Sequence, residues 1–195
     1  QNRGLLGMSI HIPDLSGTFL VYFLVFARVG AMIMLLPAIG DAGVPPRVRL
    51  ALALAISFAL APVVAKSYPD TAPQNVIALA LLIAQELTVG VLIGAIARII
   101  MSALTVAGEL IAMQTGLSYA QSFDPGMGAE SSIFSTFFTL LGVVLIFATN
   151  LHHLAIGAIE GSYSMIPPGA ALPASDMAEL AIRLTSGAFA LGLQL

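Results

Sequence analysis

The longest apolar stretch of this chain is too long for one membrane crossing. Residues 75–121, about 45 in all, contain no proline and no run of polar side chains. As one helix rising 1.5 Å per residue they would reach about 70 Å, more than twice the hydrocarbon thickness of a bilayer. The segment therefore either bends back near residues 102–108 or leaves the bilayer.

The composition predicts an all-α integral membrane protein with several helices and long helical hairpins. Hydrophobic residues make up 58% of the 195 residues and charged residues 9%, whereas a soluble domain carries about a quarter charged residues. A mean hydropathy of +1.00 excludes a disordered chain. The net charge of −3 favours no binding to nucleic acid, and the absence of cysteine excludes disulfides and thiolate metal sites.

Proline-containing loops divide the chain into apolar segments. The segments cover residues 15–39, 50–65, 75–121, 133–159 and 177–195. We expect the first two to pair as a tight helical hairpin across the tandem prolines Pro45 and Pro46. Residues 1–7 are interpreted as an upstream extension or an artificial remnant. Residues 8–195 are expected to form one domain, truncated at its C-terminal end.

Several charged residues lie within or beside apolar segments, and each costs about 2.5–3.5 kcal/mol at the centre of a lipid-facing helix. They are Arg28, Glu86, Arg98, Glu109 and Glu160. We expect the two arginines to form buried ion pairs with Glu86 or Glu109. The alternative is an ion or solute transporter in which Glu86, Arg98 and Glu109 form a relay.

Glycine pairs at helical spacing predict close packing of helices. The two GxxxG motifs are Gly90 with Gly94 and Gly157 with Gly161. A third pair, Gly108 and Gly116, lies on nearly one face of a helix. Small residues at this spacing let helix backbones approach each other, within the chain or against partners.

Catalytic and metal-binding patterns are weak. His152 and His153 are adjacent and cannot face one metal ion from a helix. Ser118 lies in a segment with a distant similarity to an intramembrane protease motif, but Ala120 occupies the position where a nucleophile elbow needs glycine. A protease using Ser118 and His152 is kept as a third hypothesis. We expect no enzyme activity, no metal and no cofactor.

The loop between the two longest apolar segments combines apolar bulk with glycine. Its candidate residues are Phe123, Asp124, Pro125, Gly126, Met127 and Gly128. One interpretation is an ordinary turn outside the membrane, and the other is a movable plug that seals a conduit.

Several motifs resemble the FliR/SctT family, the export-gate proteins of flagellar and virulence type III secretion systems. They are Arg28-Val-Gly, Gly43-Val-Pro-Pro-Arg-Val-Arg-Leu50, Gln85-Glu86-Leu-Thr-Val-Gly90, Gly108-Glu109 followed by Met113-Gln114-Thr-Gly116-Leu-Ser118, and Asp124-Pro125. The resemblance covers about residues 13–195, and the family continues beyond it through a further apolar hairpin.

The resemblance implies a subunit of the bacterial inner membrane and the flagellar basal body. Its partners would be several copies of FliP and FliQ, the FlhA-type and FlhB-type export components, and unfolded flagellar proteins. Together the subunits would form a helical cone held largely above the bilayer plane. In the family, the loop between the two long central helices projects into the channel as a plug. On this sequence the plug would comprise Ser118, Tyr119, Phe123, Asp124, Pro125, Gly126, Met127 and Gly128.

Overall fold

The computed structural model describes residues 15–68, 75–116, 133–170 and 174–194. Within these ranges the chain is helical and contains no strand, as the composition predicts. The elements in chain order are α1 (Leu15–Leu35), α2 (Pro46–Val64), the short 3-10 helix η1 (Ala65–Ser67), α3 (Val76–Gln114), α5 (Ile133–Ala148), α6 (Leu151–Met165) and α7 (Ala174–Gln194).

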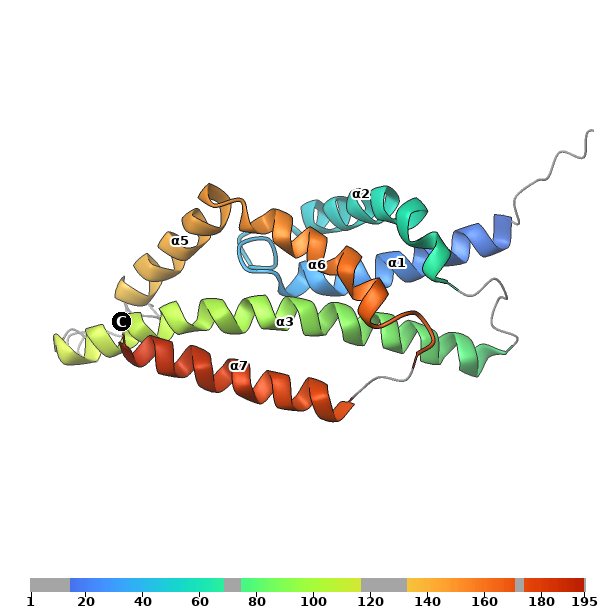
Figure 1. Ribbon diagram of the computed structural model, residues 1–195. Helices are drawn as coiled ribbons and strands as arrows, with labels where there is room; N and C mark the ends of the chain where they lie inside the picture. The colour runs from blue at the N-terminus through green and yellow to red at the C-terminus, as the bar shows by residue number, and fades with distance from the viewer. Residues whose placement is uncertain (1–14, 69–74, 117–132, 171–173, 195) are drawn as a thin grey trace, which may run out of the picture.

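Helix α3 is the axis of the fold: α1, α5 and α7 lie against it, whereas α2 packs on α1 (Figure 1). It runs without interruption for 39 residues, about 58 Å. The Asn75 side chain caps its start by accepting a hydrogen bond from the Ala78 amide at 2.7 Å. Gly116, with a φ of +73°, follows its C-terminal end. The alternative in which the segment bends back near residues 102–108 is therefore wrong, because the helix continues through these residues, Gly108 included.

Helices α1 and α2 form the expected hairpin. Pro45 and Pro46 begin α2, where a missing amide hydrogen costs least. The turn before them is fixed by Asp41, whose Oδ2 accepts a hydrogen bond from the Ala38 amide at 3.0 Å. Because α1 also packs along α3, it lies in the interior and contributes more residues to the apolar core than any other helix. That contribution is Leu24, Val25, Val29, Met32 and Ile33.

Three glycines bring α3 close to its neighbours. A Cβ atom at Gly94 would lie 2.7 Å from the Leu35 Cβ, and one at Gly90 would collide with the Arg28 carbonyl oxygen. A Cβ atom at Gly108 would lie 2.5 Å from the backbone of Ser135 in α5. The interfaces of α3 with α1 and α5 therefore depend on the absence of a side chain at these positions.

The remaining glycines of the predicted packing motifs behave differently. Gly116 follows α3 with a positive φ, and a Cβ atom there would meet nothing within 4 Å among the described residues, so it shares no contact with Gly108 within them. Cβ atoms at Gly157 and Gly161 would also meet nothing within 4 Å. Their small-residue surface on α6 has no contact within the described residues.

The apolar segment 133–159, expected to be continuous, is broken. Helices α5 and α6 meet at an angle of 71°, and Asn150 between them has a φ of 57°. Asn adopts this left-handed conformation more readily than most residues, so the chain can turn here without glycine or proline. We call α5, α6 and the bend between them the arch, which stands over α3 in Figure 1.

The far face of α3 is covered by α7, which runs alongside it (Figure 1). A Cβ atom at Gly192 would lie 2.9 Å from the Ala103 carbonyl oxygen, so this contact is also close. Even with α1, α6 and α7 in place, much of the surface of the long helices is uncovered.

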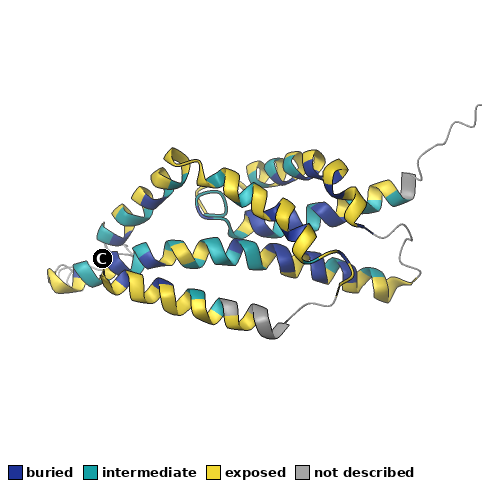
Figure 2. Cartoon of the chain, in the orientation of Figure 1, coloured by how far each residue is buried: buried dark blue, intermediate teal, exposed yellow. Residues whose placement is uncertain are grey.

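Three helical segments are long and apolar enough to cross a membrane, and the arch would add a fourth if it counts as one span. Only 33% of Gly17–Leu35, 28% of Pro46–Ser67 and 28% of Val76–Gln114 is buried inside the chain. Figure 2 shows exposed residues along α2, α5, α6 and α7. Such apolar surfaces require cover from lipid or from other subunits.

We predict that G90A lowers the free energy of unfolding by about 1–3 kcal/mol, because the added methyl group forces α1 away from α3. G157A is the matched control, since it adds the same methyl group to a helix where nothing lies within 4 Å. Unfolding of the detergent-solubilised protein by increasing dodecyl sulfate compares the variants. Equal resistance of G90A and G157A would contradict the packing described here.

Candidate functional site

A buried ion pair joins α1 to α3. Nε of Arg28 donates to Oε2 of Glu86 at 2.6 Å, and Nη2 donates to Oε1 at 3.1 Å. Both side chains are completely buried, with an exposed fraction of 0%. The planar guanidinium matches the carboxylate with two parallel hydrogen bonds, an arrangement that fixes the orientation of both groups.

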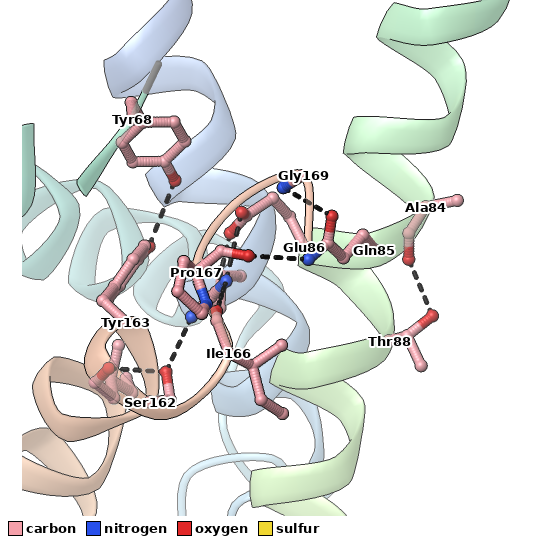
Figure 3. A network of polar contacts seen from close by, with 12 residues as sticks. Tyr68, Ala84, Gln85, Glu86, Thr88, Ser162, Tyr163, Ile166, Pro167 and Gly169 are labelled. Carbon is pink, nitrogen blue, oxygen red and sulfur yellow. Dashed lines mark hydrogen bonds and ion pairs between the residues drawn. The ribbon is translucent and has the colours of Figure 1, made fainter. Parts of the chain in front are cut away.

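The same arginine also holds the C-terminal end of α6. Nη1 donates to the Ser162 Oγ at 2.8 Å, and Nη2 donates to the Ile166 carbonyl oxygen at 3.3 Å. The guanidinium carbon lies 3.8 Å from the ring centroid of Tyr163, a cation–π contact. Arg28 therefore connects α1, α3 and α6, which are far apart in the sequence. Figure 3 shows its partners Glu86, Ser162 and Ile166 close together.

Two further contacts surround the pair. The Tyr68 hydroxyl donates to the Tyr163 hydroxyl at 3.4 Å, and burial raises the pKa of the Tyr68 hydroxyl, which keeps it protonated. The Gln85 amide donates to the Pro167 carbonyl oxygen at 3.0 Å and accepts from the Gly169 amide at 2.8 Å. We call this group the polar node; it comprises Arg28, Tyr68, Gln85, Glu86, Ser162 and Tyr163.

The polar node is built to hold helices together. Both carboxylate oxygens of Glu86 accept a hydrogen bond from Arg28, and both side chains are completely buried, an arrangement that favours a structural ion pair over a proton relay. A buried charge loses its hydration, and only a complete set of partners compensates for that loss. The node therefore acts as a clamp between α1, α3, α6 and the turn that follows α6.

The other charged candidates lie outside this clamp. Arg98 and Glu109 are exposed on α3, and Arg98 faces Asp41 with its Nη2 3.5 Å from Oδ1. The prediction that both are buried ion-pair partners is therefore wrong, because they occupy the outer face of the helix. Along α3, Arg98 is about 18 Å from Glu86 and about 16 Å from Glu109, too far for a relay within this chain. Glu160 is exposed on α6.

Beneath the arch lies an apolar groove with a cavity of about 910 Å³. Its walls come from α3, α5, α6 and the turn after α1, and representative lining residues are Ile93, Ile96, Leu104, Gly142, Ala158 and Gly161. His152, beside the bend of the arch, also lines the groove, with its ring centroid 5.3 Å from that of Phe147. The groove can accept an apolar group of substantial size.

The predicted plug residues lie outside the described residues. They are Ser118, Tyr119, Phe123, Asp124, Pro125, Gly126, Met127 and Gly128. The two helix ends that flank them are close, because Gly108 near the end of α3 packs on Ser135 at the start of α5. The protease hypothesis also depends on Ser118, whereas its other residue, His152, packs against Phe147 and His153.

Sequence reasoning missed four members of the node, namely Tyr68, Gln85, Ser162 and Tyr163. A usable signal existed, since Gln85 precedes Glu86, and Ser162 and Tyr163 lie in the polar run Glu160-Gly-Ser-Tyr-Ser164 directly after the apolar segment 133–159. Buried charges need additional hydrogen bonds to be tolerated. Polar residues in or beside the neighbouring apolar segments were therefore reasonable candidates for partners of the buried charges.

We predict that R28M lowers the free energy of unfolding by about 3–5 kcal/mol, because it leaves the Glu86 carboxylate buried without its cation. R28M combined with E86L should recover part of the loss. R98M is the control, since it removes an exposed pair worth about 1 kcal/mol at most. Dodecyl sulfate titration in detergent measures all three variants, and the account fails if R28M is as resistant as R98M.

Comparison with known proteins identifies the family. The model of the family described as "Bacterial export proteins, family 1" matches residues 19–195. The flagellar biosynthetic protein FliR of Caulobacter vibrioides is 45% identical over 172 residues, which cover 88% of this chain and 68% of the relative. The FliR proteins of Aquifex aeolicus and Escherichia coli are 34% and 31% identical, over 79% and 76% of this chain.

The chain spans between 56% and 68% of the length of these three relatives. The match nevertheless includes all the helices that form the polar node and the arch. On this basis the chain belongs to the FliR family of bacterial export proteins.

Proposed function

We propose that the chain is the gate-forming part of a FliR subunit in the flagellar type III export apparatus of the bacterial inner membrane. The observation that carries the proposal is the 45% identity to the Caulobacter FliR over 88% of the chain. The subunit helps to form and close the channel for unfolded flagellar proteins. Its partners are FliP and FliQ homologues, with FlhA-type and FlhB-type components nearby.

The distribution of apolar surface supports an assembled subunit. Less than a third of the α2 and α3 spans is buried within the chain, and exposed large side chains occur on every long helix. Gly157 and Gly161 add a small-residue surface on α6 that suits contact with another helix. Exposed Arg98 and Glu109 on α3 are better tolerated beside protein or water than beside acyl chains.

The proposed mechanism is steric closure, in which no covalent bond is made or broken. The loop between α3 and α5 serves as the plug, and the contact between Gly108 and Ser135 holds the two helix ends that carry it. A closed state favoured by a few kcal/mol stays dominant until another component binds the open state better. The clamp at the polar node keeps α3 and α6 fixed while the loop moves.

Copurification tests the assembly. The full-length protein, extracted in mild detergent from its native membrane, should elute with FliP and FliQ homologues, and native mass measurement should give one large complex. Elution as a free monomer, with intact FliP and FliQ present in the same extract, would contradict the proposal.

Replacement of residues 126–129 in the full-length protein by four serines tests the plug. We predict that ion leakage through the resting assembly increases about tenfold, the factor that corresponds to losing about 1.4 kcal/mol of closure. M127L is the control because it keeps apolar bulk in the loop, and it should leave leakage near the parent value. Conductance in reconstituted bilayers is the measurement. Unchanged leakage in the four-serine variant, with the complex intact, would remove the plug assignment.

A further inference from the structure

The C-terminal half of α3 exposes mostly polar side chains, although the helix as a whole is apolar. Within residues 92–112 the exposed side chains are Arg98, Ile100, Ser102 and Glu109. The three polar ones are four and seven residues apart, so they lie within about 40° of arc on one face of the helix. We call Arg98, Ser102 and Glu109 the polar stripe.

The polar stripe lies on the side of α3 that is turned away from the groove. Ile96, Ile100 and Leu104 line the groove, and they lie about 140–180° around the helix from the centre of the stripe. Gly94, one turn before the stripe, already meets Leu35, the last residue of α1. Helix α1 therefore ends where the stripe begins, and the stripe remains exposed.

Contacts within the chain satisfy only part of the stripe. Nη2 of Arg98 lies 3.5 Å from Oδ1 of Asp41, in a pair that is about half exposed. The Ser102 hydroxyl donates to the Ile99 carbonyl oxygen at 2.6 Å. Glu109 is exposed and forms no hydrogen bond or ion pair with any described residue. Its carboxylate therefore needs water or a cation from outside the chain.

Water is the better match for this surface. Polar side chains on helices long enough to cross a membrane mostly face protein or a water-filled path. With Arg98 paired and the Ser102 hydroxyl satisfied, the stripe presents little that a specific partner would have to complement. Asp41, Arg98 and Glu109 together carry one negative charge, so the surface holds neither sign of passing charge strongly.

The stripe also leads to the loop that is proposed as the plug. Glu109 precedes Gln114, the last residue of α3, by five residues, which is about 8 Å along the helix axis. A water-filled path that is closed by this loop would pass the end of α3 that carries it. The polar face of α3 and the proposed plug are therefore neighbours along the chain.

We propose that the polar stripe of α3 lines the water-filled path along which the unfolded substrate polypeptide travels. The inference rests on the proposed export-gate function, because it needs a path closed by the loop after α3. It adds which face of the subunit is turned toward the path, and it places the apolar groove on the other side of α3.

Cysteine modification in the assembled, full-length protein tests the proposal. These 195 residues contain no cysteine, and any cysteine in the remainder of the protein is first replaced by serine. S102C and E109C place a thiol on the stripe. I100C is the matched control, because Ile100 is two residues from Ser102 and 58% exposed but lines the groove.

The reagent is a charged methanethiosulfonate, applied to open membrane fragments in which both faces are accessible. It reacts with a thiolate, which forms in water and not in an apolar environment, so S102C and E109C should react about tenfold faster than I100C. S102C changes a single side-chain atom, so the assembly should be retained in this variant.

A halted substrate tests whether the water belongs to the export path. An export substrate fused to a tightly folded C-terminal domain should stop within the path and cover the stripe. If four-fifths of the thiols are covered, modification of S102C slows about fivefold. The same substrate without the folded domain passes through and should leave the rate unchanged.

Two results would overturn the inference. If S102C and E109C react no faster than I100C, the stripe is covered by protein or lipid. If they react fast but a halted substrate does not slow them, the stripe faces water outside the path. Copurification with FliP and FliQ homologues is measured on the same samples. When it is normal, either result rejects the stripe and leaves the proposed function standing, whereas its loss in the parent protein rejects the function itself.

Discussion

The completely buried charge of Arg28 determines how the helices of this protein are arranged. A guanidinium inside an apolar core is tolerated only where its hydrogen-bond donors and its charge are satisfied, and here the partners come from α3 and α6. Because those partners are far apart in the sequence, a single side chain specifies the relative position of three helices. The glycines at 90 and 94 bring the α3 backbone close enough to α1 for this contact.

The arch connects this clamp to the proposed gate. One end of the arch is held by Arg28, and the other packs on Gly108 beside the loop that would form the plug. The bend at Asn150 lies between these two ends. In the proposed function, the clamp and the plug loop therefore lie at opposite ends of one continuous segment of chain.

The sequence predicted the features that local chemistry decides. Tandem prolines indicated the hairpin of α1 and α2, and the cost of isolated charges in lipid indicated that Arg28 needs a carboxylate. The sequence left open whether Glu86 or Glu109 would pair with Arg28, because apolar periodicity is weak when almost every face of a helix is apolar. The same ambiguity misplaced Arg98 and Glu109. The break at Asn150 was missed, since neither proline nor glycine marks it and the bend depends on tertiary contacts at both ends of the arch.

We infer that these helices are shaped to pack among other subunits, with lipid as a minor neighbour. An electron cryo-microscopy map of the full-length protein in its native assembly tests this most directly. The map should show an unbroken α3 over residues 76–114, Arg28 in contact with Glu86, and protein density along the groove and beside Arg98. A monomer embedded in the bilayer, with acyl chains filling the groove and surrounding Arg98, would contradict it.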